Sequence, residues 1–236
     1  MTSPLLELNE LHFAWPQQPV LLDIAHFSLQ AGERLFLKGP SGSGKTTLLG
    51  LLGGVHLPQQ GEVRLLGQSL TRLSARQRDR FRAEHTGYIF QMFNLLPYLS
   101  VQDNVLLPCR FSARRKDRAL QRHGSLEAAA AHLLNGLGLS DPGLLRRPAT
   151  ALSIGQQQRV AAARALIGNP ELVIADEPTS ALDADNREAF LQLLFAECAE
   201  AGSSLLFVSH DTALAPLFDR SLALPDLNRA AHLETL

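Results

Sequence analysis

The chain has 236 residues, 45% of them hydrophobic, which is enough to bury the core of one large domain. Its net charge of −1 excludes a bulk attraction to nucleic acid, so we expect no nucleic-acid partner. Cys109 and Cys198 are its only cysteines, too few for a disulfide framework or a structural zinc site. No apolar run is long enough to cross a bilayer and no signal-peptide pattern opens the chain, so the sequence predicts a soluble, cytoplasmic protein.

The first elements predicted are two short strands at residues 5–8 and 11–15, where apolar and polar side chains alternate. Trp15, the only tryptophan, stands beside the turn that follows. An aromatic ring in this place could stack on a nucleotide base, but from the residues alone packing against the protein is the better interpretation.

A glycine-rich stretch follows a predicted strand at residues 33–38 and matches the phosphate-binding pattern G-x-x-x-x-G-K-[ST]. Its glycines let successive N–H groups turn inward around phosphates, and the helix predicted after it adds its dipole. Lys45 is expected to reach the β- and γ-phosphates, and the Thr46 hydroxyl to ligate Mg²⁺. The residues expected to bind nucleotide are Gly39, Pro40, Ser41, Gly42, Ser43, Gly44, Lys45, Thr46 and Thr47.

Further strands are predicted at residues 62–67 and 88–90, the second ending at Gln91. From residue 92 to 163 helical signals dominate, which we interpret as an inserted helical lobe. Its first segment, Met92 to Leu99, carries more large apolar groups than a short lobe easily buries. This segment is therefore either core or a groove for a partner helix.

The lobe also contains a basic run, which we interpret as a solvated loop, with binding to lipid headgroups or to an acidic partner as the alternative. The run consists of Arg110, Arg114, Arg115, Lys116 and Arg118. After it, Ser125 is expected to cap a helix over residues 126–137. Ser153 is expected to cap another helix, whose N-terminus could hold an anion.

The apolar run at residues 172–175 is typical of a central parallel strand and ends in Asp176 and Glu177. Ligands in open α/β sheets gather at the carboxyl ends of strands, so these two acids are candidates to hold Mg²⁺ and a water. Residues 205–209 repeat the pattern and end in His210.

In order and spacing, these segments resemble the ATP-binding subunit of ABC transporters over nearly the whole chain. The glycine-rich loop is similar to the Walker A motif, Gln91 to the Q-loop glutamine, and residues 152–156 to the signature motif. Residues 172–177 are similar to the Walker B strand, and residues 180–183 to the D-loop.

The resemblance also assigns the two remaining side chains: His210 is similar to the switch histidine, and Trp15 to the aromatic residue that stacks on adenine, which reverses the interpretation above. The implied fold is α/β, a P-loop NTPase (RecA-like) core with a small antiparallel β subdomain and an inserted helical subdomain. The whole chain would form one domain. Residues 1–91 and 164–236 would make up the core with the β subdomain, and residues 92–163 the helical subdomain.

The implied activity is hydrolysis of ATP with Mg²⁺ by a head-to-tail homodimer, in which each ATP lies between one subunit's Walker motifs and the partner's signature motif. Glu177 would polarise the attacking water, with His210 and Lys45 as the other catalytic residues. The implied metal ligands are Thr46, Gln91 and Asp176. Outside the loop, the implied nucleotide-binding residues are Trp15, Gln91, Ser153, Gly155, Gln156 and Asp183.

One residue departs from the family pattern: Ile154 replaces the first glycine of the usual Leu-Ser-Gly-Gly-Gln signature. Because isoleucine adopts a positive φ only at a cost, we expect a right-handed or extended backbone there and a modest change in dimer closure. Ser153 and Gly155, the phosphate-facing positions of the family, are present.

The type of transporter is suggested by residues 87–97, which look like the branch of lipoprotein-release and macrolide-efflux ATPases. The implied partner is a membrane permease that docks near Met92 to Leu99 and holds the subunit at the inner face of the membrane. Amino-acid importers share much of this pattern and remain the alternative. Soluble ABC ATPases, which usually carry coiled-coil insertions or two fused units, are a more distant one.

Overall fold

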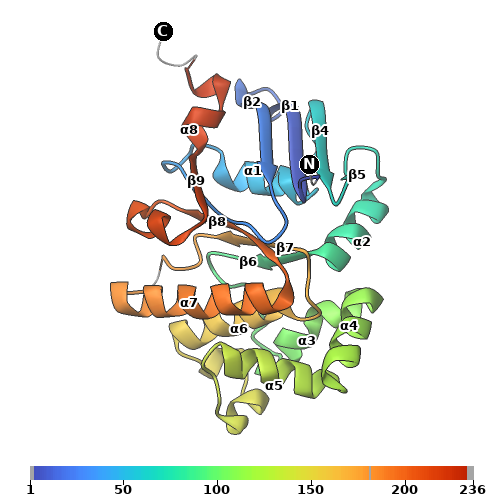
Figure 1. Ribbon diagram of the computed structural model, residues 1–236, viewed down its shortest axis with the longest axis vertical. Coiled ribbons are helices and arrows are strands. Elements are labelled where there is room, and N and C mark those ends of the chain that lie inside the picture. The colour runs from blue at the N-terminus through green and yellow to red at the C-terminus, as the bar shows by residue number, and fades with distance from the viewer. Residues whose placement is uncertain (1–2, 181, 233–236) are drawn as a thin grey trace. The chain divides into compact units, whose positions relative to one another are not determined.

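The computed structural model describes residues 3–180 and 182–232, and the chain divides into two compact units (Figure 1). The first consists of Met1–Arg82 and Leu206–Leu236, and the second of Ala83–Leu205. The boundaries fall within helix α2 (Ala75–His85) and strand β8 (Ser204–Ser209).

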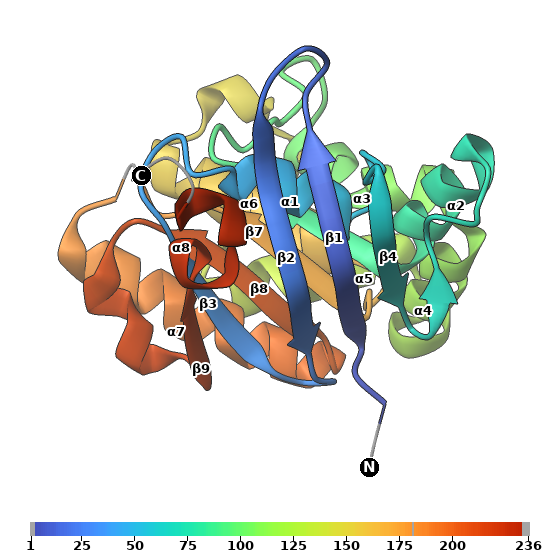
Figure 2. The same ribbon diagram turned by 90° about the horizontal axis from the view of Figure 1, so that it is seen from above.

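The first unit contains an antiparallel sheet with the strand order β2-β1-β4-β5. Its strands are β1 (Leu6–Ala14), β2 (Val20–Leu29), β4 (Gln60–Leu65) and β5 (Gln68–Ser69). Figure 2 shows β2, β1 and β4 side by side, with α1 (Lys45–Leu52) behind them. Alternate side chains of β1 are buried, as the alternation of its sequence predicts. The predicted antiparallel β region is therefore confirmed.

β1 is one continuous strand, so the prediction of two short strands in this segment is wrong. Between the two predicted segments, Glu10 takes a left-handed backbone with φ 46°. The pairing of β1 with β4 shifts register between Asn9 and His12, whereas the pairing with β2 continues from Asn9↔His26 to Leu11↔Ile24. The local break in the pattern is thus a bulge inside a strand and not a turn between two strands.

The first unit also holds β3 (Arg34–Lys38) and β9 (Arg220–Ala223), and β8, β3 and β9 are neighbours in that order. β3 and β9 pair in parallel, with Leu35 opposite Arg220. Phe36 of β3 packs on Phe207 and Phe218 at ring-centroid distances of 6.1 and 5.2 Å. The strand that leads into the glycine-rich loop is therefore fixed by buried aromatic packing. Short helical segments complete this unit: η3 (Thr212–Leu217), α8 (Leu224–Leu227) and η4 (Arg229–His232).

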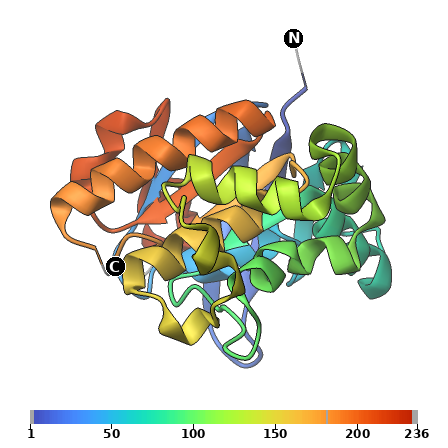
Figure 3. The same cartoon turned by 90° about the horizontal axis from the view of Figure 1, so that it is seen from below.

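The second unit combines a parallel strand pair with a group of helices. The strands are β6 (Thr86–Ile89) and β7 (Leu172–Asp176). The helices are α3 (Val101–Phe111), α4 (Ala113–His123), α5 (Leu126–Gly136), α6 (Ile154–Leu166) and α7 (Ala184–Ala201), with η1 (Pro142–Arg146) and η2 (Ala149–Ala151) between α5 and α6. Helix α6 contacts α3, α5 and α7, and Figure 3 shows these helices from below. With parallel pairs in both units and helices around them, the predicted α/β class is confirmed.

Two predictions about the helical region have different outcomes. Ser125 caps α5 by accepting a hydrogen bond from the Ala128 N–H, as expected. The basic run, however, is not a solvated loop, because most of it lies on α4 and the Arg115 side chain is buried. The Arg115 guanidinium donates to the carbonyl oxygens of Ile167 at 2.6 Å and Ala165 at 2.5 Å. Burial lowers the pKa of Arg115 to about 10, so this side chain stays charged and anchors α4 to the C-terminal end of α6.

Among the described residues, none of the helices combines the length and the apolar character needed to cross a membrane.

Candidate functional site

Residues 39–44 make a tight turn between β3 and α1, and glycine is required at several of its positions. Gly42 and Gly44 have φ values of 80° and 91°, a left-handed backbone that side chains with a Cβ rarely adopt. A Cβ on Gly39 would lie 2.7 Å from the Ser43 Oγ. The strand, loop and helix predicted around the motif are therefore present.

This turn has the polarity of an anion site. The N-terminus of α1 has no side-chain cap and no acidic residue in its first turn, so its dipole is not offset locally. The Lys45 ammonium donates to the backbone oxygens of Gly39 at 2.8 Å and Pro40 at 2.9 Å. The Ser43 Oγ is buried, and the described residues offer it no hydrogen-bond partner. A lysine folded over the loop and an unsatisfied hydroxyl fit the phosphates of a nucleotide.

Two further predicted residues lie in the first unit. Trp15 follows β1 and is half-buried, with its ring edge-on to Phe13 and His56 at centroid distances of 5.1 and 5.2 Å. It therefore packs on the protein and also keeps exposed surface; its stacking on adenine stays a prediction. His210 is exposed directly after β8.

In the second unit, three predicted residues lie at one edge of the β6–β7 pair. The strands are parallel, with Ile89 opposite Ala175. Asp176 ends β7 and Glu177 follows it, while Gln91 stands two residues beyond β6. Because the carboxyl ends of parallel strands share an edge, these three residues follow the same edge of the strand pair.

The backbone at Glu177 is unusual. Its φ is 47°, in the left-handed region, and its carbonyl accepts from the Ser180 N–H at 3.2 Å. The buried Gln158 of α6 donates through Nε2 to the Pro178 carbonyl at 2.8 Å and so holds the turn after Glu177. Sequence reasoning missed Gln158, because its place in a run of three glutamines does not reveal that its partner follows β7.

The signature segment opens α6. Ser153 is the N-cap: its Oγ accepts from the Gln156 N–H at 3.3 Å, and the Gln156 Oε1 accepts from the Ser153 N–H at 3.0 Å. Ile154 is the first residue of the helix and therefore right-handed, as predicted, with 54% of its surface exposed. This helix N-terminus again has no acidic residue in its first turn.

The D-loop segment lies close to the signature segment. A Cβ on Gly155 would be 4.0 Å from Leu182 Cδ2. Asp183 caps α7 and accepts from the Asn186 N–H at 2.9 Å and from its side-chain amide at 2.8 Å. These hydrogen bonds lower the pKa of Asp183, so the carboxylate is ionised. Ala181, part of the predicted D-loop, lies outside the described residues.

The segment Met92 to Leu99 contributes to both the core and the surface. Phe93 is buried, whereas Met92 and Tyr98 are 81% and 77% exposed. Arg164 of α6 donates to the carbonyl oxygens of Phe93 at 2.5 Å and Asn94 at 2.6 Å, which fixes the shape of the segment. Of the two interpretations left open, core packing applies to Phe93, and a groove for a partner helix at the exposed Met92 and Tyr98 stays a prediction.

Comparisons with known proteins agree with this arrangement. The family described as "ABC transporter" matches residues 22–180. The lipoprotein-releasing system ATP-binding protein LolD 2 of Rhodospirillum rubrum is 39% identical over 229 residues, which is 96% of each chain.

Solved structures are similar as well. The dimeric structure of MJ0796, a bacterial ABC transporter cassette, matches with a TM-score of 0.78 at 31% identity, over 92% of this chain and 93% of that chain. A structure of a post-hydrolysis state of MJ0796 bound to ADP and Pi gives the same values. The chain therefore belongs to the ABC transporter family, as an ATPase of that family.

Proposed function

We propose that this chain is the ATP-hydrolysing subunit of a membrane ABC transporter of the lipoprotein-releasing type. The observation that carries this proposal is the 39% identity over 96% of the chain to a lipoprotein-releasing system ATP-binding protein. The anion-binding turn before α1 supplies the physical basis for nucleotide binding.

In this proposal the first unit binds the phosphates of ATP. The N–H groups of the glycine-rich turn and the N-terminus of α1 surround them, and Lys45 moves from the Gly39 and Pro40 carbonyls to the β- and γ-phosphates. Thr46 would ligate Mg²⁺, which neutralises developing charge when bound, and Trp15 would stack on the adenine. His210 would donate a hydrogen bond to the γ-phosphate.

The second unit supplies the acids. Asp176 would hold Mg²⁺ through water and Gln91 would contact it, both from the shared edge of β6 and β7. Glu177 would orient the attacking water and accept its proton. A glutamate at this position supports hydrolysis, because an amide could not accept a proton.

We further propose that two copies act as a head-to-tail dimer. The solved MJ0796 cassette is a dimer. Ser153 and Ile154 are exposed at the N-terminus of α6, so a second copy can reach this helix end, and its dipole would add charge stabilisation at the partner's γ-phosphate. Ser153, Gly155, Gln156 and Asp183 are then the residues offered across the dimer.

Glu177→Gln tests the dimer and the role of the carboxylate together. The variant should bind Mg-ATP, lose hydrolysis and accumulate as an ATP-bound dimer, because the water can no longer be deprotonated. Size-exclusion chromatography with and without ATP measures this. The matched control is Glu188→Gln, an exposed acid of α7, which should behave as wild type. A Glu177→Gln chain that binds ATP but stays monomeric at high concentration would contradict the dimer mechanism.

The membrane partner is a permease that binds the exposed side chains of Met92 and Tyr98, and the subunit is peripheral on the inner face of the membrane. Co-purification from cells that express the neighbouring membrane genes identifies this permease. ATP-dependent release of lipoprotein from proteoliposomes would support the proposed type. Uptake of a small solute by the same complex would instead favour an importer.

A further inference from the structure

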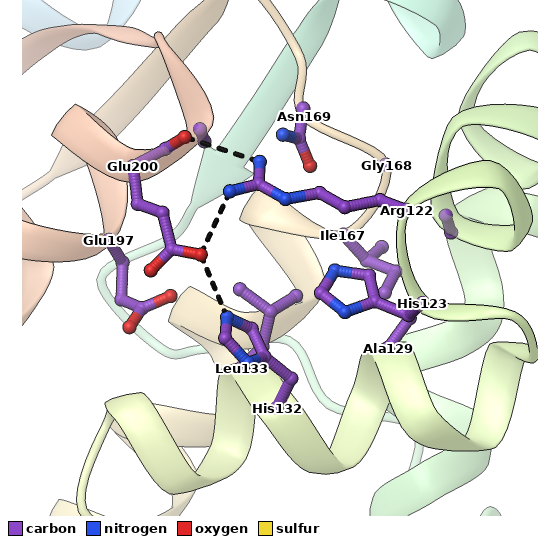
Figure 4. A pocket seen from close by; sticks show the side chains of 12 residues that line it. Arg122, His123, Ala129, His132, Leu133, Ile167, Gly168, Asn169, Glu197 and Glu200 are labelled. Atoms are coloured by element: carbon purple, nitrogen blue, oxygen red, sulfur yellow. Dashed lines mark hydrogen bonds and ion pairs between the residues drawn. The ribbon is translucent and has the colours of Figure 1, made fainter.

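A cluster of titratable side chains lies in the second unit, on α4, α5 and α7, and includes none of the residues proposed to bind ATP or Mg²⁺. His132 of α5 and Glu197 and Glu200 of α7 each offer a ligand atom, and these three atoms lie within 4.8 Å of one another. Figure 4 shows their side chains pointing into one pocket, with Arg122 and His123 of α4 beside them.

Glu197 is the unusual member of the cluster. Only 6% of its surface is exposed, and the described residues give its carboxylate neither a hydrogen bond nor an ion pair. Its carboxylate packs against Gly136, where a Cβ would lie 1.8 Å from Oε1. A buried, unpaired carboxylate is costly, so the site needs either a proton or a cation to neutralise it. Burial, and then the charge of Glu200, raise the pKa of Glu197, and the nearby charges of His132 and Arg122 offset this only in part.

The size of the cavity limits what else can enter. It has a volume of about 10 Å³, which suits one water molecule or one ion and excludes an organic ligand. Apolar side chains, including Leu133 and Ile167, form part of its lining and limit the number of competing polar partners.

We propose that His132, Glu197 and Glu200 bind one divalent first-row transition-metal cation, represented here by Zn²⁺. One imidazole and two carboxylates are a ligand set that such cations favour, whereas Mg²⁺ and Ca²⁺ prefer oxygen ligands alone. Tetrahedral ligands of Zn²⁺ lie roughly 3.4 Å apart, from bonds of about 2.1 Å. The His132 Nε2 and the Glu200 Oε1 are already 3.0 Å apart, so only modest side-chain movement is needed.

Two neighbouring groups modulate this site. The Arg122 guanidinium donates to the Glu200 Oε1 at 2.8 Å and to the Glu200 backbone oxygen at 3.2 Å, so it holds a ligand atom and repels a cation. The His123 ring lies 4.7 Å from the His132 ring. Burial, then His132 and Arg122, lower the pKa of His123, and Glu200 opposes this.

A cation held by this cluster would join α5 to α7. The D-loop residue Asp183 caps the N-terminus of helix α7, so the cation would stabilise the position of that helix without contacting nucleotide.

The test measures Zn²⁺ binding to the nucleotide-free full chain in an Asp176→Asn background, which removes the other expected divalent site. Equilibrium dialysis should find one tight Zn²⁺ per chain. Glu197→Gln and His132→Ala should each weaken this affinity by at least about tenfold. Glu188→Gln and His26→Ala are the matched controls, since both residues are exposed and outside the cluster, and they should bind as the parent does.

A variant in the opposite direction makes the test sharper. Arg122→Gln removes the competing cation, so it should bind Zn²⁺ more tightly than the parent. If the pocket holds only a water beside an Arg–Glu ion pair, the affinity will not rise.

Two measurements need no variant within the cluster. Co²⁺ should give d–d absorption bands that Zn²⁺ displaces, and Zn²⁺ binding should release protons at pH 7, detected by calorimetry in buffers of different ionisation enthalpy.

The proposal is overturned if the parent binds Zn²⁺ no more tightly than Glu197→Gln does, or if Co²⁺ gives no displaceable bands. Circular dichroism checks that each variant is folded. Glu197→Gln should fold at least as well as the parent, because it removes a buried charge without changing the volume of the side chain.

Discussion

Lys45 has two roles. Its ammonium bonds to the carbonyl oxygens of Gly39 and Pro40 in the loop, and it carries the positive charge that phosphates require. Lys45→Ala should therefore abolish measurable hydrolysis and weaken nucleotide binding, because the site depends on electrostatic attraction. Turnover assays with a fluorescent nucleotide titration measure both effects. Lys38→Ala, a lysine at the end of β3 outside the loop motif, is the control. Near-normal turnover of the Lys45 variant would contradict the assignment of this loop as the phosphate-binding site.

Replacing Ile154 tests how strongly the ATPase rate depends on glycine at this position of the signature motif. Its side chain is exposed at the first turn of α6, and the two neighbours that face phosphate in this family are unchanged. Ile154→Gly should therefore change the ATPase rate by less than about tenfold, which is about 1.4 kcal/mol in the barrier. Steady-state turnover at saturating Mg-ATP measures it. A gain of about a hundredfold would show that isoleucine makes this subunit a slow ATPase.

At the scale of elements, ion pairs join α4 to the loop between α6 and β7. Glu171 accepts hydrogen bonds from Arg114 at 2.7 Å, Arg118 at 2.8 Å and His85 at 2.9 Å. Burial alone would raise the pKa of Glu171, but the hydrogen bonds from these three side chains outweigh it and lower the pKa from 4.5 to about 2. The carboxylate therefore binds fewer protons in the folded state than in the unfolded state.

This depressed pKa predicts how stability depends on pH. The contribution of Glu171 is fully present above pH 4.5 and is lost as the pH falls towards 2, on the order of 3 kcal/mol in total. Glu171→Gln should thus unfold more easily than wild type at pH 6 and show a smaller further loss between pH 5 and pH 3. Urea unfolding at several pH values measures this, with Glu188→Gln as control. Equal pH slopes for wild type and Glu171→Gln would contradict the assignment.

At the scale of the whole molecule, the proposed docking of a permease can be tested at the exposed side chains of the segment after Gln91. Met92→Glu and Tyr98→Glu should abolish co-purification with the permease while the ATPase of the isolated subunit persists, because both side chains are exposed and outside the core. Phe93 is unsuitable for this test, since a charge there would be buried and would unfold the segment.

Val55→Glu is the matched control for docking, because Val55 is also an exposed apolar residue but lies in the other unit. If folded Met92 and Tyr98 variants hold the permease at wild-type stoichiometry, the docking surface lies elsewhere.

The features that could be predicted from sequence are those whose cause is local. The glycine-rich turn, the Ser125 and Ser153 caps and the polar ends of the strands each depend on residues a few positions apart. The burial of Arg115 could not be predicted, because it bonds to a carbonyl 50 residues away in the sequence. The bond from Gln158 to the Pro178 carbonyl is another such contact, visible only once α6 and β7 are packed.

The left-handed backbone at Glu177 has a consequence for engineering this protein. A residue with a Cβ gives up about 1–2 kcal/mol in that conformation, and glycine would recover much of it. Selection for thermostability alone would therefore favour glycine at position 177 and remove the carboxylate on which hydrolysis is proposed to depend. Stability and turnover oppose each other at this single residue, so a screen for stabilised variants has to select for both properties together.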